Sequence, residues 1–158
     1  MELEGDFDIS VALNVLSFGI PAKQRKSAFY LVVEFPDEIK TKARLVFLES
    51  IERGRRLYAQ VQHVEDSGNQ VYHKIGAVSV DTIEGLRIAR RGKRFSFIFR
   101  EKGSQREALL GHANINTMAI PKTYIRLMLH TSGAGRQSEV LLKQAQFFAE
   151  KIDPSPPE

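Results

Sequence analysis

Apolar and polar residues alternate with a period of two near the start of the chain. Over residues 7–15 the apolar side chains stand at the odd positions, beginning Phe7, Ile9 and Val11, with Asp8 and Ser10 between them. This alternation is typical of a β-strand that buries one face.

Two further segments predict strands, and the first of them, residues 28–35, is apolar on both faces. Residues 28–35 are rich in aromatic and β-branched side chains, which predicts a central strand. Residues 42–48 predict another strand, with Ala43 and Phe47 on one face. A helix from 37 to 52 competes with this strand, because Ile39, Ala43 and Phe47 also match helical spacing. A second short helix near 38–52 therefore stays open.

Turn residues divide the middle of the chain into two predicted hairpins. Strands over 57–64 and 70–80 are joined by residues 65–69, which include Gly and Asn at positions where a hairpin needs positive φ. Strands over 94–100 and 108–117 are joined around Lys102-Gly103-Ser104.

The second hairpin and the strand after it have predicted core faces. Alternation places Phe95, Phe97 and Phe99 on one face of the second hairpin. A further strand over 124–130 is expected to point Ile125, Leu127 and Leu129 inward.

The end of the chain predicts a helix. Ser138 is a suitable N-cap, and apolar residues of 138–151 and just beyond fall on one helical face: Leu141, Ala145, Phe148 and Ile152. Residues 153–158 contain three prolines and predict a flexible tail. The fold class expected is mostly β, an antiparallel sandwich or barrel with one C-terminal α-helix, in a single domain over 1–152.

Composition narrows the possible functions. The 158 residues include no cysteine, which excludes disulfides and thiolate metal sites, and the net charge is +4 with a pI near 9.4. No stretch approaches the roughly 18 apolar residues of a membrane span, and the N-terminal sequence is acidic where a signal peptide is basic. We therefore expect a cytoplasmic protein without a transmembrane segment, with any membrane contact peripheral.

Basic residues gather in three clusters, which we predict to bind anions. The first cluster lies in a segment expected to be a loop before a strand and consists of Arg87, Arg90, Arg91, Lys93 and Arg94. The second consists of Arg53, Arg55 and Arg56, and the third of Lys23, Arg25 and Lys26. The competing interpretation is a set of solvated charges that blunt the sheet edges.

Motifs for catalysis or metal binding are not evident. The four histidines are scattered, although His63 and His73 face each other across the first predicted hairpin. The glycine-rich segment 133–138 lacks the Gly-Lys-Ser/Thr ending of a phosphate-binding loop. We expect no catalytic residue, no metal and no cofactor.

Two short resemblances to known families are present. Residues 79–88 resemble the second signature of PilZ cyclic-dinucleotide receptors, an Asp/Asn-x-Ser-x-x-Gly element, with Val80 at its acidic position and Thr82 at its serine. This resemblance implies a small-ligand receptor. The order of strands, with residues 109–115 late in the chain, is similar to calcium- and phospholipid-binding β-sandwich domains, although their paired aspartate loops are not visible.

The leading hypothesis is a non-enzymatic binding or assembly module. Its basic loops would engage an anionic membrane or nucleic acid, and its sheet edges a protein partner or a second copy, as in a viral matrix-type structural protein. The alternatives are a PilZ-like cyclic-dinucleotide receptor and an enzyme whose site is assembled from distant residues.

Overall fold

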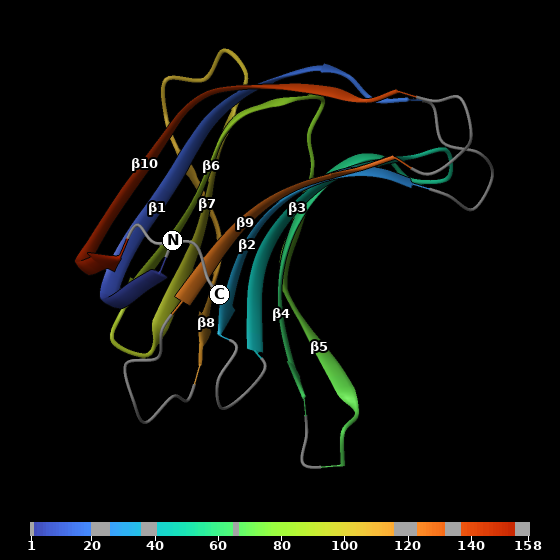
Figure 1. Ribbon diagram of the computed structural model, residues 1–158. Helices are drawn as coiled ribbons and strands as arrows, with labels where there is room; N and C mark the ends of the chain where they lie inside the picture. Colours follow the sequence, from blue (N-terminus) through green and yellow to red (C-terminus); the bar gives the residue numbers. More distant parts are fainter. Residues whose placement is uncertain are drawn as a thin grey trace.

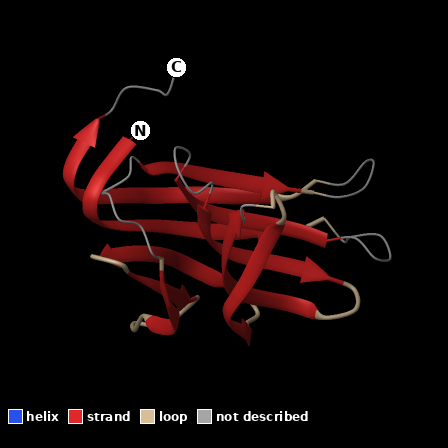
Figure 2. Ribbon diagram, turned by 90° about the horizontal axis from the view of Figure 1, so that it is seen from below, coloured by secondary structure: helices blue, strands red, loops and turns tan. Residues whose placement is uncertain are grey.

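The protein consists of β-strands throughout its described part. The computed structural model describes residues 2–19, 26–35, 41–64, 67–115, 123–131 and 137–153, and within these ranges it contains no helix (Figures 1 and 2). The strands are β1 Glu2–Ser17, β2 Lys26–Phe35, β3 Thr41–Ser50, β4 Gly54–Val64, β5 Gln70–Ser79, β6 Ile83–Arg91, β7 Arg94–Glu101, β8 Ala108–Asn114, β9 Thr123–His130 and β10 Glu139–Asp153.

Two antiparallel sheets of five strands face each other. The first sheet has the order β10-β1-β6-β7-β8, and the second has the order β9-β2-β3-β4-β5. They are joined at one end, where Glu2 and Leu3 of β1 pair with Tyr124 and Thr123 of β9. Figure 1 shows two curved layers that face each other, with the strands of the second sheet bent so that their outer face is concave.

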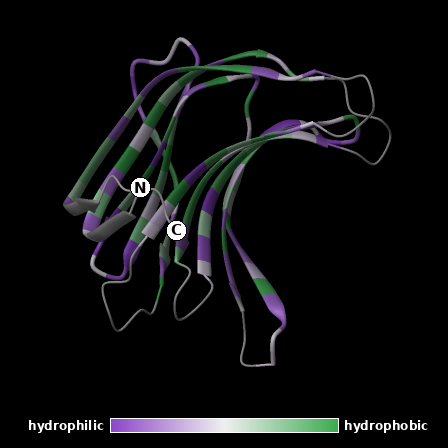
Figure 3. Cartoon of the chain, in the orientation of Figure 1, coloured by the Kyte–Doolittle hydropathy of each residue, from purple (hydrophilic) through white to green (hydrophobic). Residues whose placement is uncertain are grey.

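Side chains from both sheets fill the space between the layers, and hydrophobic residues recur along the strands of both layers (Figure 3). The alternation in β1, β3 and β7 sends every second residue inward, and most of these inward residues are completely buried. Within this core the ring of Phe95 meets two other rings edge-on. Its centroid lies 5.8 Å from that of Phe7 and 5.6 Å from that of Phe35. Such edge-to-face contacts orient the aromatic core as well as filling it.

Both predicted hairpins are confirmed. β4 pairs with β5 and β7 with β8, and Phe95, Phe97 and Phe99 are buried. The strand predicted over 124–130 is β9, but only part of its inward face is covered. Leu127 and Leu129 stay 38% and 43% exposed, because most of this strand pairs on one side only, with β2.

The predicted C-terminal helix is wrong, since residues 139–153 form strand β10 along β1. The error has a local cause. A bulge at Lys143 lies between the pairs Leu13–Leu142 and Ala12–Gln144, and it reverses which side chains face the core. Val140 before the bulge and Ala145 after it both pack inward. The apparent helical face combined the inward-packing Ala145 with Leu141 and Phe148, which are apolar but exposed on the other face of the strand.

The alternative helix near 38–52 is also wrong where it can be compared, because residues 41–50 form β3. Ala43 and Phe47 face the core, while Val46 is fully buried on the opposite face. A strand buried on both faces has no polar stripe to distinguish it from a buried helix.

The loop expected before β7 is a strand as well. Residues 83–91 form β6, which lies between β1 and β7 with Leu86 and Ile88 in the core. Its arginines concealed the apolar alternation of the segment. Of the predicted tail, Asp153 ends β10 and residues 154–158 lie outside the described ranges.

Candidate functional site

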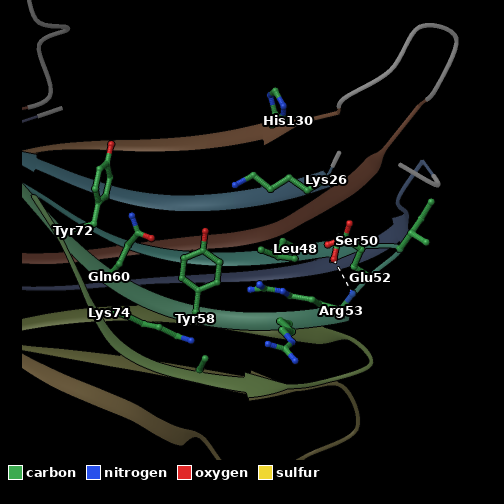
Figure 4. A pocket seen from close by; sticks show the side chains of 13 residues that line it. Lys26, Leu48, Ser50, Glu52, Arg53, Tyr58, Gln60, Tyr72, Lys74 and His130 are labelled. Atoms are coloured by element: carbon green, nitrogen blue, oxygen red, sulfur yellow. Dashed lines mark hydrogen bonds between the residues drawn. The ribbon is translucent and has the colours of Figure 1, made fainter. Parts of the chain in front are cut away.

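A groove of about 720 Å³ runs across the concave outer face of the second sheet (Figure 4). Its floor comes from β3, β4 and β5, and one end is formed by the turn between β3 and β4, at Glu52 and Arg53. Lys26 of β2 and His130 of β9 complete the lining. Its volume falls within the usual range for ligand sites.

Strand register explains why these side chains share one face. Because side chains alternate, Arg56, Tyr58 and Gln60 of β4 point outward while the residues between them enter the core. The pairing of β4 with β5 sets Lys74 beside Gln60. A bulge at Ile75 then brings Ala77 beside Tyr58, so that this small residue leaves the floor open there.

Arg44 of β3 holds neighbouring side chains in place at the wall of the groove. Its Nη2 donates to Gln62 Oε1 at 3.0 Å, and its guanidinium carbon lies 5.5 Å from the centre of the Tyr72 ring. Gln60, in the amide orientation that gives its oxygen a donor, accepts from Arg44 Nε at 2.7 Å. This network fixes two amides and an aromatic ring at the groove wall.

The lining is cationic and largely uncompensated. Four of its side chains are basic and one, Glu52, is acidic. Among the described residues, no carboxylate lies within ion-pairing distance of Arg53, Arg56 or Lys74. The Nε atom of Arg56 is buried and has no hydrogen-bond partner. Unpaired donors facing a groove favour an anionic or strongly accepting ligand.

Two tyrosines lie on this face with their hydroxyl groups protonated. Burial raises the pKa of Tyr58 above 10.0, the neighbouring Tyr30 raises it further, and Arg44 opposes the rise. Burial likewise raises the pKa of Tyr30, again opposed by Arg44. In Figure 4 the Tyr58 ring stands in the middle of the groove, between Lys74 and Arg53. A protonated phenol there both donates and accepts hydrogen bonds.

The three predicted basic clusters lie in different surroundings in the structure. The structure brings Lys26 together with Arg53 and Arg56 in the groove, so two clusters converge. Arg55 points elsewhere and binds Glu49 and the carbonyl oxygen of Asp81. Lys23 and Arg25 lie outside the described residues.

The first cluster belongs to the first sheet and is mostly occupied by internal contacts. Arg87 binds Asp8 and Glu107, and Arg91 Nη1 donates to the carbonyl oxygen of Phe7. Arg90 is only 4% exposed, and its burial lowers its pKa. Lys93 and Arg94 border a separate hollow at the turn after β6.

Several groove residues were not predicted: Tyr58, Gln60, Tyr72, Lys74 and His130. The alternation of polar and aromatic residues in β4 was the available signal, but a solvated sheet face gives the same pattern. His63 and His73, predicted to face each other, do stack across β4 and β5 with ring centroids 5.0 Å apart. The described ranges hold no cluster of three or more potential metal ligands.

These features define an antiparallel β-sandwich with a groove on the concave face of one sheet. The sequence profile of the family described as "Protein of unknown function (DUF1583) C domain" matches residues 1–158, and the chain belongs to this family. A sequence comparison with curated proteins finds no match.

A solved structure shares the fold. The alginate lyase from Klebsiella pneumoniae superposes with a TM-score of 0.61 at 8% sequence identity, over 92% of this chain. The chain spans 60% of the length of that lyase. At this identity the likeness establishes the fold only.

These findings correct the leading hypothesis. A non-enzymatic module that grips membrane headgroups or nucleic acid through basic loops is not supported, because the first cluster lies in strand β6 and its arginines serve internal contacts. The structural neighbour is an enzyme of the lyase class. The resemblance of residues 79–88 to PilZ receptors gains no support from the family match. Within the described ranges, no helix has the length and apolar character needed to cross a membrane.

Proposed function

We propose that the concave face of the second sheet binds an acidic polysaccharide. The observation that carries the proposal is the set of uncompensated cations, Arg53, Arg56 and Lys74, in a groove that also presents Tyr58 and Tyr72. Cations attract a negatively charged polymer, and phenol and amide groups match sugar hydroxyls, which both donate and accept hydrogen bonds.

The open shape of the groove supports a polymeric ligand. It crosses several strands and is lined from the β3–β4 turn to β5, so a chain can lie across the sheet without its ends being enclosed (Figure 4). The similarity in fold to an alginate lyase adds support, because alginate is itself a carboxylate-bearing polysaccharide.

The proposal is tested by titration calorimetry with alginate and polygalacturonate, and with dextran as the uncharged comparison. We expect binding to the acidic polymers that weakens as salt is added. A triple variant, Arg53→Gln, Arg56→Gln and Lys74→Gln, is expected to lose this binding. The matched control removes the same charge from exposed positions outside the groove, Arg94, Lys102 and Arg106. A wild-type protein that binds no polysaccharide, or a groove variant that binds as well as the control, contradicts the proposal.

A second candidate function is cleavage of the bound polymer by β-elimination, and Tyr58 favours it. In this reaction a base, for which His130 of the groove lining is the candidate, takes the proton next to the sugar carboxylate. The bond to the leaving sugar oxygen breaks, a carbon–carbon double bond forms, and the leaving oxygen takes a proton. A protonated phenol at the centre of the groove is placed to supply that proton, and Arg56, two residues away on β4, can neutralise the carboxylate.

Turnover is measured as the ultraviolet absorbance of the unsaturated product. Cleavage predicts a rise in absorbance that Tyr58→Phe abolishes while binding persists. A flat signal with wild-type protein that binds the polymer leaves a binding domain and rejects the lyase.

A further inference from the structure

We propose that Arg56 makes the groove selective for carboxylate-bearing sugars, by pairing end-on with one carboxylate through its two terminal nitrogens. This inference rests on the proposed function, and it names the residue and the chemical group that set its specificity.

The surroundings of Arg56 leave its donors available to a ligand. Its neighbours in the strand pairing are Leu48 on β3 and Ser79 on β5, neither of which carries a charge. Among the described residues its guanidinium has no hydrogen-bond or ion-pair partner, and of its nitrogens only Nε is closed off from solvent. The two terminal nitrogens are therefore the donors that a ligand can reach.

The preceding residue shows the contrast within one strand. Arg55 Nε donates to Glu49 at 3.1 Å and its Nη1 donates to the carbonyl oxygen of Asp81 at 2.9 Å. The guanidinium of Arg55 therefore has hydrogen-bond partners inside the protein, whereas no described side chain accepts a hydrogen bond from Arg56. The difference follows from alternation, which turns the two adjacent side chains to opposite faces of β4.

Guanidinium geometry selects the ligand group. The outward N–H bonds of the two terminal nitrogens of arginine are parallel and coplanar, which matches the two oxygens of a carboxylate. A lysine at the same position keeps the charge but donates from a single point. Charge alone and planar pairing can therefore be separated by Arg56→Lys.

The experiment measures binding of polygalacturonate and of its carboxyl-reduced, uncharged form to wild-type protein, Arg56→Lys and Arg56→Gln. For both variants we expect the affinity for the acidic polymer to fall about 10- to 100-fold, as for the loss of a charge-assisted hydrogen bond. Affinity for the reduced polymer should change by less than about twofold. Arg94→Lys, at the exposed first position of β7 outside the groove, is the matched control, and thermal melting checks that each variant is folded.

The outcomes separate the two proposals. If wild-type protein binds the acidic polymer and Arg56→Lys binds it within about twofold of wild type, planar pairing by Arg56 is wrong and the proposed function stands. Equal losses for the acidic and the reduced polymer also overturn the inference, because they show that Arg56 does not read the carboxylate. If wild-type protein binds neither polymer, both proposals fail.

Discussion

Asp8 on β1 accepts two hydrogen bonds from Arg87 on β6, from Nε at 2.8 Å and from Nη2 at 2.6 Å. The same guanidinium donates to Glu107 at 2.7 Å through Nη1. The pKa of Arg87 is raised, chiefly by its hydrogen bond to Asp8; burial opposes the rise, and the hydrogen bond to Glu107 adds to it. This bidentate pair ties neighbouring strands together, so the most conspicuous basic segment of the sequence serves the fold.

Replacing Asp8 is therefore expected to destabilise the protein. Asp8→Asn removes the charge that Arg87 pairs with and should lower the free energy of unfolding by about 1–3 kcal/mol. Urea denaturation measures the difference. Asp81→Asn, at an exposed position, should stay within about 0.5 kcal/mol of wild type. Equal effects of the two variants would show that the pair contributes nothing to stability.

Two adjacent phenylalanines test the strand at the C-terminal end. Phe147 packs against the core, whereas Phe148 is 65% exposed. Phe147→Ala should cost about 2 kcal/mol of stability, less than a fully buried phenylalanine because part of its surface is already in water. Phe148→Ala should change stability by less than about 0.5 kcal/mol. Denaturation curves that place the larger loss at Phe148 contradict β10 as a strand and favour the helical face that contains Leu141 and Phe148.

A close approach of β5 to β8 predicts a glycine requirement. A Cβ atom at Gly76 would overlap the carbonyl oxygen of Leu110, and one at Gly111 would lie 2.8 Å from Cγ2 of Ile75. Gly76→Ala should therefore destabilise the protein by about 1–3 kcal/mol, since a backbone carbonyl cannot turn aside as a flexible side chain does.

The control for this substitution is a second strand glycine. Gly85 lies in β6, where an added Cβ would meet Arg100 Cβ at an ordinary 3.4 Å. Gly85→Ala should cost less than about 0.5 kcal/mol. Thermal melting that shows both variants equally stable means that β5 and β8 do not approach so closely.

Two partly buried tyrosines, Tyr30 and Tyr58, predict a loss of stability at alkaline pH. Because the folded-state pKa of Tyr58 is raised above the ordinary 10.0, its contribution is fully present below about pH 10 and is lost as pH rises through the folded pKa. The double variant Tyr30→Phe and Tyr58→Phe removes both raised groups, so its stability should fall less steeply than that of wild type above pH 10. Denaturation at a series of pH values gives the two slopes, and parallel slopes contradict the prediction.

Much of the strand pattern is visible in the sequence because burial imposes period two. The alternation in β1 and the Phe95–Phe97–Phe99 series of β7 each predict the face that the structure buries. The failures occur where a second effect interrupts or hides that period. The bulge at Lys143 interrupts the alternation of β10, and the arginines of β6 give this core strand the composition of a loop.

The sequence by itself determined most of the sheet-forming segments, most of the core, and the presence of three basic clusters. Only the tertiary structure decided which cations are neutralised within the fold and which remain open. Arg87 meets Asp8 across 79 positions of the chain, whereas Arg56 and Lys74 reach a shared groove without a carboxylate partner among the described residues. The reason is physical: local alternation fixes the face to which a side chain points, but strand order and register fix its neighbours, and these depend on contacts between distant segments.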